Sequence, residues 1–241
     1  MKLCILDNDH IDVAAQPRWH SYGVMTEQLL RRAGFAGEID IFIARDGLYP
    51  PDASDYDAVI LTGSRSDAFG DDPWVATLRE HVTQMLQAGQ RLVGICFGHQ
   101  LIAHCLGAPV GRAPNGWAVG RTVYDWLGPQ AMADGQGHMA FLASHQDQVL
   151  ALPAGAQLLA RNDHCPVAAY TVDQQVLCIQ PHPEFDSDYS AYLLETRRQV
   201  FGTELSDQAL TVLKPEHDGV AFARYVLQFI QADTSSGQAS A

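Results

Sequence analysis

Short apolar runs alternate with longer segments of helical periodicity through the first half of the chain. The apolar runs at residues 2–6, 38–44, 57–63 and 91–96 predict buried strands. Apolar residues recur at three- and four-residue steps over 19–33 and 74–88, which predicts amphipathic helices. Gly34 and Gly89 follow these two segments, at the position where a left-handed C-terminal cap favours glycine. This alternation is typical of a parallel sheet with helices on both faces.

The pattern changes after about residue 108 into short extended segments separated by Gly, Pro or Asp. These segments predict an antiparallel extension of the sheet, and two amphipathic helices are expected near 187–199 and 217–230. The predicted fold is therefore an α/β class, three-layer open sheet that is mainly parallel, with helices on both faces and an antiparallel extension. We expect one domain over residues 1–232 and a disordered tail over 233–241, where the sequence is of low complexity.

Composition narrows the class of protein further. The 241 residues carry 15 Lys+Arg against 28 Asp+Glu, a formal charge of −13, which argues against nucleic-acid binding. A hydrophobic content of 47% is that of a folded globular chain. Asp7 and Asp9 interrupt the first apolar run, and no run approaches the ~20 residues needed to cross a bilayer. We expect a cytoplasmic protein without membrane contact.

The five cysteines are odd in number and widely spaced, and they form no C-x-x-C pair. This argues against a disulfide framework and against a zinc site, and His164 with Cys165 lacks further ligands nearby. We expect no metal. Most free cysteines are small buried apolar residues, which is our interpretation of Cys4, Cys105, Cys165 and Cys178.

Cys96 differs because it stands in Gly94-Ile95-Cys96-Phe97-Gly98, between an apolar strand and an apolar helix. This is the pattern of a nucleophile elbow, in which two glycines relieve crowding at a strained strand-to-helix turn. The start of the following helix would stabilise a thiolate. Cys96 is therefore the candidate nucleophile.

A base and its orienting group follow in the segment Pro181-His182-Pro183-Glu184. A predicted strand delivers His182, and Pro183 restricts how the Glu184 carboxylate can lie against the imidazole. Because Pro181 cannot donate to a sheet ladder, we expect that strand end to lie at an edge. Amide cleavage also requires oxyanion donors, for which the backbone N–H groups of Phe97 and Gly63 are the candidates.

Together these segments resemble the class I glutamine amidotransferases, and most closely the stand-alone relatives of the GMP synthase glutaminase domain. The matching features are the glycine loop at Gly63, GICFGHQ at 94–100, SHQDQV at 144–149 and PHPE at 181–184. The resemblance covers about residues 2–185. Gly63 is followed by Ser64-Arg65 where that branch usually has a Gly-Gly-Pro run, which leaves the role of Arg65 open.

The resemblance implies a γ-glutamyl thioester on Cys96, formed from glutamine with release of ammonia. It implies that His182 acts as base and then acid, that Glu184 orients it, and that Gln100 and the Ser144-His145 backbone hold the amino-acid end of glutamine. No cofactor is implied.

Three functions stay open. The sequence contains no G-x-x-x-x-G-K-[ST] phosphate loop, and we expect no synthetase domain. As an amidotransferase, the protein would then pass ammonia to a separate synthetase or acceptor partner. Alternatively, the same triad would hydrolyse γ-glutamyl peptides or amides, and the segment 111–120 resembles those peptidases equally well. In the third hypothesis Cys96 is a non-catalytic thiol sensor. Trp117 and Trp126 are expected either at the pocket mouth or over the sheet.

Overall fold

The computed structural model describes residues 1–130, 137–214 and 216–232. The expected tail at 233–241 lies outside these residues. Within them, nine strands form one sheet in the order β2-β1-β3-β4-β11-β10-β9-β6-β7, and β5 and β8 form a separate two-stranded sheet. None of the helices in the described ranges is long and apolar enough to span a bilayer.

Five parallel strands form one half of the main sheet, and antiparallel strands extend it. The parallel strands are β1 (Lys2–Asp7), β2 (Glu38–Ile43), β3 (Ala58–Leu61), β4 (Leu92–Ile95) and β11 (Val176–Ile179). The antiparallel strands are β6 (Ala118–Trp126), β7 (His138–His145), β9 (Gln157–Arg161) and β10 (Ala169–Val172), while β5 (Val110–Arg112) and β8 (Asp147–Val149) pair with each other. The predicted fold class is confirmed.

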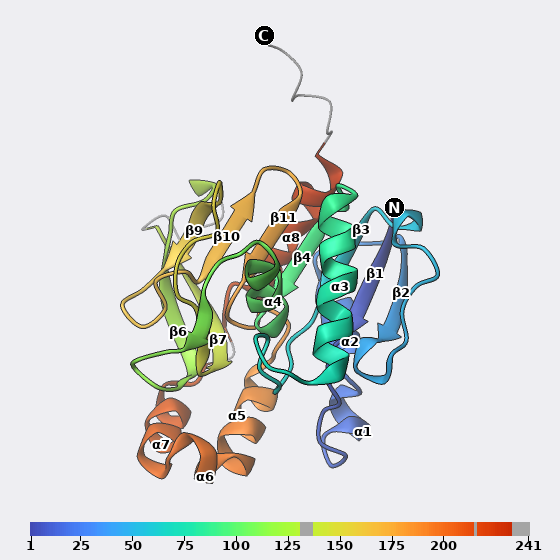
Figure 1. Cartoon of the computed structure of the whole chain (residues 1–241). Helices are drawn as coiled ribbons and strands as arrows, with labels where there is room; N and C mark the ends of the chain where they lie inside the picture. The colour runs from blue at the N-terminus through green and yellow to red at the C-terminus, as the bar shows by residue number, and fades with distance from the viewer. Residues whose placement is uncertain (131–136, 215, 233–241) are drawn as a thin grey trace.

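Helices cover both faces of the sheet (Figure 1). They are α1 (Gln16–Trp19), α2 (Tyr22–Arg32), α3 (Pro73–Gln87), α4 (Phe97–Cys105), α5 (Ser187–Thr196), α6 (Arg198–Phe201), α7 (Thr203–Val212) and α8 (Gly219–Gln231), with short 3₁₀ turns at Ala44–Asp46 and Ala53–Asp55. Helices α3 and α4 lie on one face, α2 and α8 lie on the other, and α5 to α7 lie beyond one end of the sheet.

Successive side chains of each strand point to opposite faces of the sheet, so the core is divided into two layers. In β1, Leu3 and Ile5 point toward α2 and α8, whereas Cys4 and Leu6 point toward α3 and α4. All four side chains are almost completely buried. Two buried faces per strand explain why the central strands are continuously apolar in sequence.

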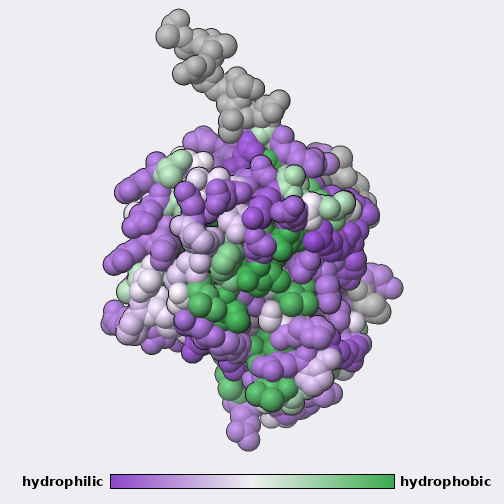
Figure 2. All heavy atoms as spheres, turned by 90° about the vertical axis from the view of Figure 1, so that its right-hand side faces the viewer, coloured by the Kyte–Doolittle hydropathy of each residue, from purple (hydrophilic) through white to green (hydrophobic). Residues whose placement is uncertain are grey.

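The strand before His182 is not at an edge, contrary to our expectation from Pro181. Strand β11 lies between β4 and β10 in the middle of the sheet. Its last ladder residue is Ile179, so Pro181 falls beyond the ladder and need not donate to it. The edge of the parallel half is β2, and Figure 2 shows apolar side chains gathered along the middle of the face on that side.

Candidate active site

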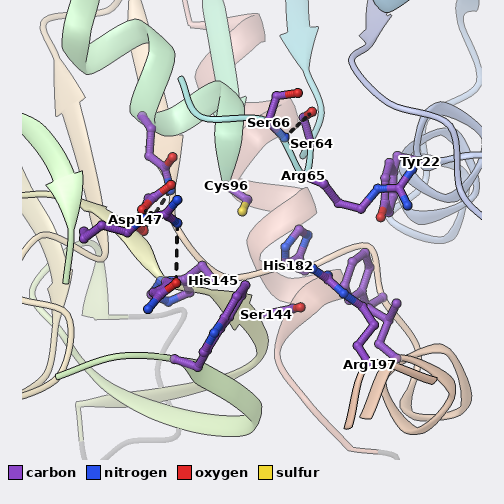
Figure 3. Close-up of a pocket in the computed structure, with 16 residues that line it drawn as sticks. Tyr22, Ser64, Arg65, Ser66, Cys96, Ser144, His145, Asp147, His182 and Arg197 are labelled. Carbon is purple, nitrogen blue, oxygen red and sulfur yellow. Dashed lines mark hydrogen bonds and ion pairs between the residues drawn. The ribbon is translucent and has the colours of Figure 1, made fainter. Parts of the chain in front are cut away.

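The candidate residues come together because neighbouring parallel strands end at the same edge of the sheet. The loops after β1, β3, β4 and β11 carry Asp9, Gly63, Cys96 and His182, respectively. These four strands are adjacent in the sheet. Cys96 and His182 are thus brought to one pocket together with Ser64 and Arg65, which follow Gly63 in the chain, and Figure 3 shows this pocket in close-up.

Cys96 occupies a strained backbone conformation between β4 and α4. Its φ of 51° and ψ of −102° are unusual for a residue with a side chain. The flanking glycines are required by close packing, because a Cβ on Gly94 would lie 2.7 Å from the backbone of Gly98, and one on Gly98 would lie 2.5 Å from the Leu61 carbonyl oxygen. This geometry is that of the predicted elbow, and it turns the Cys96 sulfur into the pocket.

His182 is held by backbone, carboxylate and ring contacts. Its backbone N–H donates to the Leu142 carbonyl oxygen at 2.8 Å, which ties the segment after β11 to β7. The ring Nδ1 lies 2.7 Å from Glu184 Oε1, and the ring stacks on Phe185 with centroids 3.9 Å apart. Both His182 and Glu184 are buried. The imidazole therefore has one fixed orientation, with Nδ1 toward Glu184.

Cys96 and His182 line the same pocket, and Figure 3 shows their side chains on facing walls. Burial alone would lower the pKa of His182, but the negative charges of Glu184 and of a Cys96 thiolate outweigh it and raise the pKa to about 10. His182 is consequently an imidazolium at neutral pH.

The two expected oxyanion donors differ in their surroundings. A Cβ on Gly63 would lie 2.9 Å from His182 Cε1 and 3.7 Å from Cys96 Cβ, so this backbone runs directly beside the pair. Phe97 packs its ring on Trp74 in the core, and its N–H lies in the first turn of α4, where N–H groups have no partner inside the helix. Neither residue lines the pocket with a side chain.

The loop that carries Gly63 is clamped on both sides by residues that follow β1. The Asn8 backbone N–H and side-chain amide donate to Thr62 Oγ1 and to the Thr62 carbonyl oxygen, each at 2.9 Å. Asp9 Oδ2 accepts from the Arg65 backbone N–H at 2.9 Å and from Arg65 Nε at 3.0 Å. The Asp9 side chain is only 1% exposed. The roles of Asp9 and Arg65 were not predictable from the sequence, because this clamp depends on the adjacency of β1 and β3.

The other predicted contacts lie across the pocket from His182. Gln100, Ser144 and His145 all line it. The Gln100 side-chain nitrogen is engaged inside the protein, since it donates to the Asp147 carbonyl oxygen at 2.9 Å and to Gln180 Oε1 at 3.1 Å. Burial, with the charges of His182 and His164, lowers the pKa of His145 to about 3, so its imidazole is neutral at pH 7.

Three arginines line the pocket: Arg65, Arg112 and Arg197. Arg112 bridges the loop after β3 to β8, with nitrogens 3.2 Å from Asp67 Oδ1 and 3.0 Å from Asp147 Oδ1. Burial raises the pKa of Asp147 to about 6 despite the opposing effect of Arg112. No sequence pattern identified Arg112 or Arg197 as part of a site.

The two tryptophans have different locations. Trp117 lines the pocket, whereas Trp126 is buried in the core against Phe222 and donates its indole N–H to the Pro129 carbonyl oxygen. The described residues contain no cluster of three or more His, Cys, Asp or Glu side chains that could hold a metal ion.

Comparisons with known proteins show what the chain is similar to. Residues 21–196 match the sequence model of the family described as "Glutamine amidotransferase class-I". The chain is 32% identical over 198 residues to "Gamma-glutamyl peptidase 3" of Arabidopsis thaliana, covering 78% of both proteins. It is 29% identical over 216 residues to a glutamine amidotransferase-like protein of Gibberella zeae, covering 86% of this chain and 87% of the relative.

Solved structures show the same fold at low sequence identity. A glutamine amidotransferase from Thermotoga maritima superposes with a TM-score of 0.77 at 16% identity, covering 96% of this chain and 98% of that one. A proposed GMP synthase subunit from Thermoplasma acidophilum gives a TM-score of 0.58 at 18% identity, covering 95% of this chain and 97% of that one.

Proposed function

Because the chain belongs to the class I glutamine amidotransferase family, we propose that it hydrolyses the γ-carboxamide bond of a γ-glutamyl compound. Cys96 is the nucleophile, His182 carries the proton and Glu184 orients His182. The observation that carries the proposal is the placement of one buried imidazole, fixed by Glu184 at 2.7 Å, in the same pocket as the elbow cysteine. A structural thiol would not require this charged partner.

In the first half of the reaction, the Cys96 thiolate attacks the γ-carbonyl carbon and a C–S bond forms. The carbonyl oxygen becomes an oxyanion, for which the Gly63 and Phe97 N–H groups are the proposed donors. When the C–N bond breaks, the His182 imidazolium gives its proton to the leaving nitrogen, which departs as ammonia or an amine. A γ-glutamyl thioester remains on Cys96.

In the second half, a water molecule attacks the thioester carbonyl while His182 takes one of its protons. The C–S bond breaks, glutamate leaves, and the thiolate–imidazolium pair is restored. The overall reaction consumes one water and yields glutamate and one amine, and no redox step is involved. Gln100 and the backbone at Ser144 and His145 are the proposed contacts of the amino-acid end.

Glutamine is the simplest substrate, and its ammonia would pass to a synthetase or other acceptor partner. A second candidate substrate is a γ-glutamyl peptide, in which the leaving amine is larger. This candidate is favoured by the Arabidopsis relatives named gamma-glutamyl peptidases, two of which are 32% and 34% identical to the chain. Both substrates would use the same acyl chemistry on Cys96.

The test is to incubate the purified protein with glutamine and with a panel of γ-glutamyl dipeptides and to follow the release of glutamate and amine. We expect hydrolysis of at least one compound, and its loss in Cys96→Ala. Faster turnover of dipeptides than of glutamine would identify the peptide as the substrate. Hydrolysis that survives in Cys96→Ala would contradict the proposal. The absence of hydrolysis of every compound would also contradict it, and would favour the thiol sensor.

A further inference from the structure

Arg197 differs from the other two arginines of the pocket in its charge balance. Arg65 lies 3.0 Å from Asp9 and 3.3 Å from Asp12, and Arg112 is paired with Asp67 and Asp147. Arg197 has no ion pair within the described part of the chain. In a protein with a formal charge of −13, a pocket-lining guanidinium without a carboxylate beside it is available to an anionic ligand.

Aromatic rings hold the Arg197 guanidinium in place. It lies 5.6 Å from the centroid of the Trp117 ring and 5.0 Å from that of Phe201, and these two rings pack edge to face on each other. A guanidinium that stacks on ring faces keeps its N–H groups free at the edges. The side chain is half-buried, at the junction of α5 and α6. Arg197 is thus preorganised to donate two parallel hydrogen bonds to a carboxylate.

The position of Arg197 indicates which part of a substrate it meets. In Figure 3 it lies on the same side of Cys96 as His182, whereas Asp147 lies on the opposite side. His182 gives its proton to the leaving nitrogen, so the leaving group has to lie on the His182 side of the sulfur. A carboxylate attached to the leaving amine would then come toward the pocket wall that Arg197 and Trp117 form.

We propose that Arg197, stacked on Trp117 and Phe201, binds the free carboxylate of the amino acid released from a γ-glutamyl peptide. This inference rests on the proposed function and deepens it, because it assigns a specificity for leaving groups that are themselves amino acids or peptides. Ammonia, the leaving group of glutamine, has no carboxylate and gains nothing from Arg197.

The test compares two substrates that differ only in that carboxylate, γ-glutamyl-glycine and γ-glutamyl-glycinamide. We expect Arg197→Met, which keeps the unbranched stem over the aromatic rings, to lower kcat/KM for γ-glutamyl-glycine by about 10- to 100-fold, the range of a hydrogen-bonded charge pair. Activity on γ-glutamyl-glycinamide should stay within about twofold of the wild type, and Arg197→Lys should recover part of the loss. Arg198→Met is the matched control, because the neighbouring Arg198 pairs with Asp207 instead.

Equal losses on both substrates in Arg197→Met would overturn the inference, since Arg197 would then bind the glutamyl half or support the fold. Unchanged activity on both would also overturn it. Either result leaves the proposed function standing, because the wild-type protein still hydrolyses both compounds. If the wild type hydrolyses neither compound, nor glutamine, the proposed function itself fails.

Discussion

Asp9 offers a sharp test of how the oxyanion loop is held. Its carboxylate accepts hydrogen bonds from the Arg65 backbone N–H and from Arg65 Nε, while the preceding residue, Asn8, donates two hydrogen bonds to Thr62. Gly63 lies between these two attachments. Replacing Asp9 with Ala removes the hydrogen bonds that it accepts from the Arg65 backbone N–H and Nε, and leaves Arg65 with its exposed contacts to the His10 carbonyl oxygen and Asp12.

The magnitude follows from the number of donors affected. Loss of one oxyanion donor costs about 10²- to 10³-fold in kcat. We expect Asp9→Ala to lower kcat by only about 10- to 100-fold, because the Asn8–Thr62 bonds and the Phe97 donor remain. The change in KM should be smaller, since the oxyanion donors act mainly in the transition state. Asp9→Asn keeps an oxygen that can accept from the Arg65 N–H, so we expect its kcat to fall by only about 3- to 10-fold.

The assay measures kcat and KM on the best γ-glutamyl substrate, together with urea unfolding to confirm that each variant is folded. Asp12→Ala is the matched control, because Asp12 also pairs with Arg65 but is 41% exposed, and such a pair contributes at most about 1 kcal/mol. Full kcat in Asp9→Ala, or an equal loss in Asp12→Ala, would refute the clamp.

Three further predictions test other parts of the site. Gly63→Ala should lower kcat strongly, because its Cβ would lie 2.9 Å from His182 Cε1. In the control Gly111→Ala the new Cβ would come no closer than 3.4 Å to another atom, and activity should be normal. Equal activity of the two variants would contradict the close approach at Gly63. Glu184→Gln should lower kcat/KM by about 100-fold or more and shift the alkaline limb of the pH–rate profile to lower pH, because it removes a negative charge that raises the pKa of His182. An alkaline limb at the wild-type pH would contradict this. His99→Phe should make folding stability less sensitive to acid, because burial lowers the pKa of His99 from 6.5 to about 3 and the stability contributed by the neutral ring is lost as pH falls below 6.5. By pH 5 the free energy of unfolding in urea should fall by about 2 kcal/mol more in the wild type than in the variant. Parallel stability curves against pH would contradict this.

The sequence was most informative where local chemistry requires particular residues. The elbow at Cys96 was predictable because the close approach of Gly94 and Gly98 to other backbone atoms excludes any side chain there. The contact between His182 and Glu184 was predictable because both belong to one short segment. Gly34 and Gly89 have the positive φ values expected of helix C-terminal glycines.

Features that depend on tertiary packing were missed. The helix α7 was not expected, because few of its residues are apolar; it is fixed by Ala209, which packs against the β6 backbone at Gly120. Arg197 carries no sequence signal, since its role depends on Trp117, eighty residues earlier in the chain. The interior position of β11 was missed because strand order is set by long-range pairing.

The most direct test of the central claim is to mix the protein with its γ-glutamyl substrate, quench the reaction in acid within milliseconds and locate any covalent adduct by peptide mass spectrometry. We expect one γ-glutamyl group on Cys96 in the wild type, and its absence or much slower formation in His182→Ala. A γ-glutamyl group on another residue, or equally fast formation on Cys96 without His182, would contradict the account.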